Sequence, residues 1–212
     1  MRVGLIRILA EYAAFETEVR QQLAHICAPH CAVCERVCCR PEYCRETIDS
    51  PFLALLNSEI SPNSQCIADR GWLTSSGCAL SAGRPPVCYQ FICKKIFDSL
   101  PDDTSRYLLE VLSELVVHAG KRAFGSRHLV EIMDLGTLER VDVERFEKRL
   151  TVARYALEAI RSFAGNASLP DAALKILTKI KPRPARPVSR TFQAKNPEFR
   201  NLAVQKAQVL QL

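Results

Sequence analysis

Residues 27–44 read CAPHCAVCERVCCRPEYC, and residues 77–93 read GCALSAGRPPVCYQFIC. These two stretches contain nine of the ten cysteines of the chain, and the tenth, Cys66, lies between them. No cysteine follows Cys93. A disulfide-stabilised scaffold usually spreads its cysteines along a whole small secreted chain. The clustering indicates instead a module that binds a metal through cysteine thiolates.

The segment that carries these cysteines has too few aliphatic residues to form a core of its own. Residues 61–93 are rich in Ser, Gly, Pro and Cys, and they show no sustained helical or strand period. In small peptides the binding energy of a structural zinc ion is about 10–16 kcal/mol, and it acts as folding energy. We therefore expect residues 27–93 to form an irregular module that a metal stabilises.

The rest of the chain predicts helices. Apolar residues recur at spacings of three and four, and helix-start and helix-stop signals flank them. These patterns predict helices over residues 2–26, 51–60, 101–120, 127–134 and 141–163. Asp102, Asp103, Asp142 and Glu144 are interpreted as charges at helix starts, and Ser50–Pro51 as a helix cap. The predicted fold is mostly α, with helices packed on the cysteine-rich module and no substantial sheet.

We divide the chain into a single domain over residues 1–165 and a tail over residues 166–212. The domain contains the module at 27–93 and a helical part at 101–165. From Asp171 onward there are nine Lys or Arg and two Asp or Glu residues, and residues 181–187 read KPRPARP, which favours polyproline II. Apart from a short helix around residues 172–180, we expect this basic tail to be flexible.

The charge and the N-terminal sequence restrict location and partners. A basic tail attracts polyanions, and either it or the helices could engage a protein partner. No nucleic-acid module is recognisable, so we do not expect nucleic acid binding. Arg7 and Glu11 interrupt the apolar N-terminal stretch, and no apolar window is long enough for a membrane span. We therefore expect a cytoplasmic protein without a membrane span.

The cysteine spacing suits a soft or borderline metal. The first group reads C-x3-C-x2-C-x3-C-C-x4-C from Cys27 to Cys44, and the second reads C-x11-C-x9-C-x4-C from Cys66 to Cys93. Ligands two to four residues apart can reach one ion, and a distant pair commonly completes a four-coordinate site. Zinc and iron–sulfur clusters both accept four thiolates, so the spacing leaves both open.

The second stretch also resembles a known family. The pattern G-C-x5-R-P-x2-C-x2-F-x-C over Gly77–Cys93 resembles the second half of the YkgJ-type cysteine-cluster family, described as a zinc- or iron-chelating domain. Cys66 matches a preceding cysteine of that family, and Cys31 to Cys39 match its first half with one extra residue before the adjacent pair. The resemblance implies a ligand pool of eight residues: Cys31, Cys34, Cys38, Cys39, Cys66, Cys78, Cys88 and Cys93.

Eight thiolates exceed what one tetrahedral ion needs. The alternatives are two metal sites or one polynuclear cluster, such as a 4Fe–4S cluster with accessory cysteines. Cys27 and Cys44 are extra relative to the family pattern, and we interpret them as small buried or exposed thiols.

Arg84 could donate to a ligand sulfur or be an ordinary loop arginine, while Phe91 and Trp72 are expected to pack over the site. His25 and His30 flank the first group and are weaker candidate ligands, and we expect His118 and His128 to have surface or cap roles.

The predicted function is metal binding with a structural, redox or metal-handling role. The alternative is a cluster-dependent protein-modifying enzyme, such as a lysine N-methyltransferase, because the cysteine pattern is distantly similar to that of flagellin lysine-N-methylase. Binding of S-adenosylmethionine would favour this alternative. The sequence offers no nucleophile elbow, no H-E-x-x-H motif and no obvious carboxylate pair, so whether the protein is an enzyme stays open.

Overall fold

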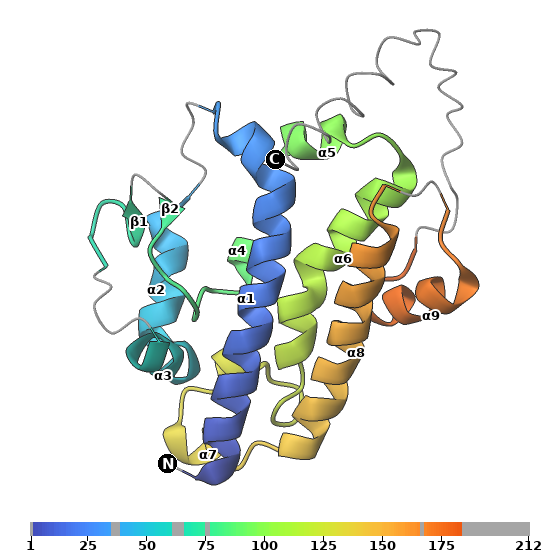
Figure 1. Ribbon diagram of the computed structural model, residues 1–212. Coiled ribbons are helices and arrows are strands. Elements are labelled where there is room, and N and C mark those ends of the chain that lie inside the picture. The colour runs from blue at the N-terminus through green and yellow to red at the C-terminus, as the bar shows by residue number, and fades with distance from the viewer. Residues whose placement is uncertain (1, 35–38, 61–65, 75–76, 166–167, 184–212) are drawn as a thin grey trace, which may run out of the picture.

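The computed structural model of the protein describes residues 2–34, 39–60, 66–74, 77–165 and 168–183. These residues form a mostly helical structure with one very small two-stranded sheet, as predicted (Figure 1). The helices are α1 (Val3–Cys31), α2 (Pro41–Asp49), α3 (Pro51–Ile60), α4 (Val87–Gln90), α5 (Lys94–Ser99), α6 (Asp103–Gly120), α7 (Leu135–Leu138), α8 (Val143–Phe163) and α9 (Asp171–Ile180). The strands are β1 (Leu73–Thr74) and β2 (Gly77–Cys78), and a 3-10 helix, η1, covers Leu129–Glu131.

Three long helices, α1, α6 and α8, pack side by side and enclose the main core (Figure 1). The apolar stripe predicted for residues 101–120 is the buried face of α6, on which Val111, Leu112 and Leu115 are fully buried. Asp102 and Asp142 lie at helix starts, as predicted, and each caps its helix by accepting a hydrogen bond from the third residue after it, at 2.7 and 3.0 Å. None of the described helices combines the length and the apolar character needed to cross a bilayer.

Within the cysteine-rich part of the chain, α2, α3 and the β1–β2 pair lie on the opposite side of α1 from α6 and α8 (Figure 1), whereas α4 packs against α6. This part of the chain is more regular than predicted, because α2 and α4 form within it. Helix α2 begins at Pro41, and the N–H that proline lacks would have no intrahelical hydrogen-bond partner at this position. Cys44 and Thr47, three residues apart, form the buried face of this helix. The predicted helix at 51–60 is present as α3, which begins at Pro51 after Ser50.

Two helix predictions differ from the structure. Helix α1 continues past residue 26 and through Pro29 to Cys31, because a proline in the last turn of a helix removes only one backbone hydrogen bond. The segment 127–134 forms only the short η1, and α7 follows it as a separate turn that Asp134 caps.

The packed body extends beyond residue 165. Helix α9 corresponds to the short helix expected around 172–180, and its Leu177 is fully buried against the main core. The hydroxyl of Tyr107 on α6 also donates to the carbonyl of Lys181 at 3.0 Å. Residues 184–212, most of the basic tail, lie outside the described residues, and their predicted flexibility stays a prediction.

Tyr12 of α1 provides a test of the core. Its side chain is fully buried, its ring stacks edge-to-face on Phe52 with 5.1 Å between centroids, and its hydroxyl has no hydrogen-bond partner among the described residues. A buried hydroxyl without a partner costs free energy. We expect Tyr12→Phe to raise the free energy of unfolding by about 1 kcal/mol, measured by urea denaturation of the metal-free protein. A loss of stability in this variant would contradict the assigned environment.

His128 has the predicted cap role. Its Nδ1 accepts from the Val130 N–H at 3.2 Å, its backbone N–H donates to Glu131 at 2.7 Å, and its Nε2 lies 3.1 Å from the carbonyl of Val117. With Nδ1 accepting, Nε2 carries the proton and donates to Val117, so the ring is neutral. Burial is the main cause that lowers the pKa of His128 to about 4.

This pKa makes stability dependent on pH. The unfolded chain binds a proton at His128 below about pH 6.5, whereas the folded chain binds it only near pH 4. The contribution of His128 to the free energy of unfolding is therefore complete above pH 6.5 and decreases as the pH falls towards 4. We expect an NMR titration of the His128 imidazole in folded protein to give a midpoint near 4, and a midpoint near 6.5 would show that the cap is absent.

Candidate metal centre

Four thiols line one cavity of about 220 Å³ in the cysteine-rich part of the chain. They come from separate segments: Cys39 precedes α2, Cys44 lies on α2, Cys78 ends β2, and Cys88 lies on α4. The remaining lining residues are Arg40, Tyr43, Leu80, Arg84, Pro85 and Phe91. The cavity thus combines thiol donors, a guanidinium and apolar walls.

The β1–β2 pair positions Cys78. The two antiparallel strands pair Leu73 with Cys78 and Thr74 with Gly77. Behind them Trp72, Leu80 and Cys44 form a small hydrophobic cluster of their own, against which Cys78 packs. Trp72 therefore packs against two of the cavity cysteines, Cys44 and Cys78, while its predicted packing over a metal site stays a prediction.

A buried carboxylate positions the segment that carries Cys88. Glu16 of α1 is fully buried, and its Oε2 accepts from the Gly83 N–H at 2.8 Å. Its Oε1 accepts from the Arg84 N–H at 2.9 Å and from the Tyr89 hydroxyl at 2.6 Å. The Thr47 hydroxyl of α2 donates to the Gly83 carbonyl at 2.9 Å. The segment from Gly83 to Tyr89 is therefore tied to both α1 and α2.

The close packing of Gly83 explains why a glycine is found there. Its φ is +80°, and an added Cβ would lie 3.0 Å from the carbonyl oxygen of Leu53.

Burial raises the pKa of Glu16, and the hydrogen bonds from Tyr89, Gly83 and Arg84 oppose this rise. Three donors reach the carboxyl group, and its ionised form can accept from all of them.

Arg84 places a positive charge at the cavity wall. Its guanidinium donates to the carbonyl of Leu80 at 3.0 and 3.1 Å and to the carbonyl of Cys78 at 3.2 Å. Because these hydrogen bonds go to backbone carbonyls, the guanidinium acts on the thiols through its charge. It lowers the pKa values of Cys39 and Cys88 against larger effects that raise them.

Without a bound cation the cavity favours protonated thiols. Burial, followed by the negative charge of neighbouring thiolates, raises the pKa of Cys88 to about 12. Cys88 is an exposed residue by its surface area, but enough protein surrounds its sulfur for desolvation to dominate. Burial, followed by the negative charge of Cys44, also raises the pKa of Cys39. A cation among these sulfurs would reverse the electrostatic effect and favour thiolates.

The eight predicted ligands do not gather at one point. Cys39, Cys78 and Cys88 line the cavity, Cys34 and Cys66 are exposed, and Cys38 lies outside the described residues. Cys31 and Cys93 lie elsewhere, near Cys27, where α1 ends and α5 begins. Burial, followed by the negative charge of these two cysteines, raises the pKa of Cys27 to about 11.

The cavity residues fit a thiophilic metal by their chemistry. Among the described residues no group of three or more His, Cys, Asp or Glu side chains already has an arrangement that could hold an ion. The donor set is nevertheless four thiols at one cavity, and the buried indole N–H of Trp72 beside them lacks a hydrogen-bond partner in the described part of the chain. Thiolate sulfur accepts such a hydrogen bond, as outer-shell donors do in metal sites.

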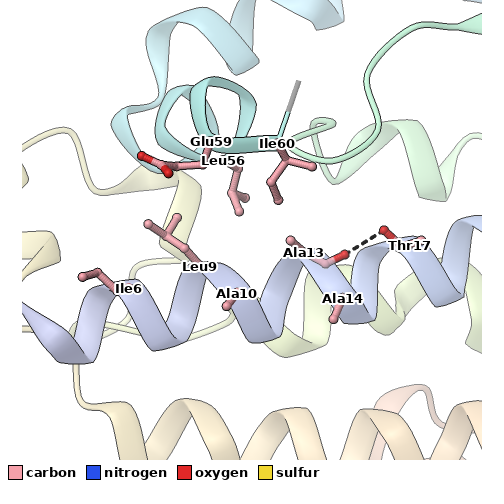
Figure 2. Close-up of a pocket in the computed structure, with 9 residues that line it drawn as sticks. All are labelled: Ile6, Leu9, Ala10, Ala13, Ala14, Thr17, Leu56, Glu59 and Ile60. Carbon is pink, nitrogen blue, oxygen red and sulfur yellow. Dashed lines mark hydrogen bonds between the residues drawn. The ribbon is translucent and has the colours of Figure 1, made fainter. Parts of the chain in front are cut away.

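A larger hollow between α1 and α3 is unrelated to the thiols. Figure 2 shows Ile6, Leu9 and Ala13 of α1 facing Leu56 and Ile60 of α3 across an apolar groove of about 490 Å³. Its lining contains no cysteine, and the Thr17 hydroxyl bonds within α1 to the Ala13 carbonyl at 2.9 Å. The groove therefore offers no thiolate donors.

Comparison with known proteins does not identify a family. Searches with protein-family models, among curated proteins and among solved structures gave no significant match to this chain. Membership of the YkgJ-type family therefore stays a prediction from the motif over Gly77–Cys93.

Proposed function

We propose that this protein binds a zinc ion or an iron–sulfur cluster through cysteine thiolates at the cavity that Cys39, Cys78 and Cys88 line. The observation that carries the proposal is the meeting of three predicted ligands, distant in sequence, beside the guanidinium of Arg84. Cys38, adjacent to Cys39, belongs to the same predicted ligand set. The proposed role is structural, redox or metal handling in a reducing cytoplasm, where cysteines are available as thiolate ligands.

Each neighbouring residue has a defined part in this proposal. Cys39, Cys78 and Cys88 would hold the metal, and Arg84 would offset part of the thiolate charge. Glu16 and Tyr89 hold the backbone on either side of Cys88, and Leu80, Pro85 and Phe91 restrict water at the cavity. When bound, zinc would cross-link these segments, whereas an iron–sulfur cluster would supply one-electron redox chemistry.

A cobalt titration tests the proposal. Metal-free protein, prepared anaerobically, should acquire the intense thiolate-to-metal absorption of a cysteine-bound Co²⁺ ion as CoCl₂ is added. Cys78→Ser/Cys88→Ser is expected to lose most of this absorption, while Cys27→Ser, a control outside the cavity, should retain it. Wild-type protein that shows no thiolate absorption, or a double variant that matches wild type, would contradict the proposal.

A further inference from the structure

Cys44 occupies the most enclosed position among the cavity thiols. It is the buried cysteine of the four, with 6 % of its surface exposed, although the family pattern contains no counterpart for it. Together with Cys39, Cys78 and Cys88 it lines the cavity. Cys44 is thus close to thiols that come from three other segments of the chain.

The backbone at Gly71 is shaped around the sulfur of Cys44. A Cβ built on Gly71 would lie 2.3 Å from Cys44 Sγ, and the φ of Gly71 is +62°. Two hydrogen bonds between Ile67 and Gly71, of 2.6 and 2.8 Å, close this turn. Only glycine, without a side chain, allows the turn to approach the sulfur this closely.

The next residue, Trp72, presents an unused donor at the same place. Its ring is 3 % exposed and packs in the cluster with Cys44 and Leu80, and its Nε1–H has no partner among the described residues. An indole N–H usually finds a hydrogen-bond partner when it is buried. A thiol is a weak acceptor, whereas a metal-bound thiolate or a cluster sulfide accepts such a bond readily.

We propose that Cys44 is a metal ligand that completes a four-thiolate site with Cys39, Cys78 and Cys88, and that Trp72 donates its indole N–H to a sulfur of this site. The ligand class is a thiophilic cation, either Zn²⁺ or the iron of a cluster, for which four thiolates are a complete set. This inference rests on the proposed function and adds a ligand that the motif does not contain. A purely structural Cys44 would stabilise the fold without any effect on the metal.

The single tryptophan of the chain supplies the readout. Because Trp72 packs against Cys44, a bound ion should change its fluorescence. Metal-free wild type, Cys44→Ser and Cys27→Ser are titrated anaerobically with Cd²⁺, used as a thiophilic probe, while native mass spectrometry counts the bound ions. We expect the emission of Trp72 to change with ion binding in wild type and in Cys27→Ser. Cys44→Ser should bind about 100-fold more weakly or lose one ion, because a coordinating thiolate is missing.

Two controls separate the ligand role from folding. Far-UV circular dichroism shows whether each metal-free variant is folded. If Cys44→Ser does not fold, the wild-type titration still tests whether the ion binds beside Trp72, because the emission of Trp72 must then change. Trp72→Phe, which removes the N–H, should weaken binding by about 10-fold. Unchanged Trp72 emission in wild type that has bound Cd²⁺, or a folded Cys44→Ser that binds Cd²⁺ like wild type, would overturn this inference but not the proposed function. Wild type that binds no ion would overturn the proposed function as well.

Discussion

Replacing Glu16 with glutamine should lower the free energy of unfolding of the metal-free protein by roughly 3–5 kcal/mol. The carboxylate accepts from three donors, at Gly83, Arg84 and Tyr89, and all three contacts are buried or partly buried. The glutamine amide has a single oxygen, and its NH₂ group would face at least one backbone N–H. Two donors would then oppose each other in a buried site, and at least one of them would lose its hydrogen bond. Urea denaturation measures the difference.

Glu18 on the same helix provides the matched control. Its carboxylate accepts from Arg161 Nη1 at 3.1 Å, but its side chain is 39 % exposed. Exposed ion pairs contribute little, so Glu18→Gln should change stability by no more than about 1 kcal/mol. Equal effects of the two substitutions would show that Glu16 does not anchor the segment from Gly83 to Tyr89.

Gly120→Ala should destabilise the protein by roughly 2–3 kcal/mol, although alanine normally stabilises a helix by about 1 kcal/mol relative to glycine. The structure places Gly120 within α6, as its last residue. An added Cβ would lie 2.2 Å from the Cε1 and Nε2 atoms of His128. The ring would have to move away from Val117 and Val130, to which it is hydrogen-bonded.

A double-mutant cycle tests the cause of this effect. In a His128→Ala background the obstructing ring is absent, so Gly120→Ala should be nearly neutral or stabilising. Thermal or urea unfolding of the four proteins gives the coupling energy. An equal cost of Gly120→Ala in both backgrounds would show that the close approach of His128 is not responsible.

The parts of the fold that follow from local pattern were predictable from the sequence. The stripe of α6 repeats every three to four residues and follows Asp102, so both the buried face and the start of the helix could be predicted. The same holds for α8 after Asp142. Helix α2 was not predicted, because a short helix that contains Cys44 and Thr47 lacks an aliphatic stripe and depends on tertiary packing.

The candidate site was predictable only in part. The motif indicated Cys78 and Cys88, but nothing in the spacing distinguishes Cys44, whose enclosure depends on Gly71 in a later turn. Glu16 carries one usable signal, a carboxylate on the apolar face of α1, four residues after Tyr12 and three before Val19. Its partners lie 67 to 73 residues away, and contacts at that separation follow from the fold and not from a local pattern.

The most direct test of the central claim is metal and acid-labile sulfide analysis of anaerobically purified protein, with its absorption spectrum. We expect either iron with sulfide and a broad visible absorption band, or colourless protein that holds at least one zinc ion per chain. In both cases Cys78→Ser/Cys88→Ser should contain less metal than wild type. A folded wild-type protein that contains neither zinc nor iron would contradict the claim that this cavity of thiols is a metal centre.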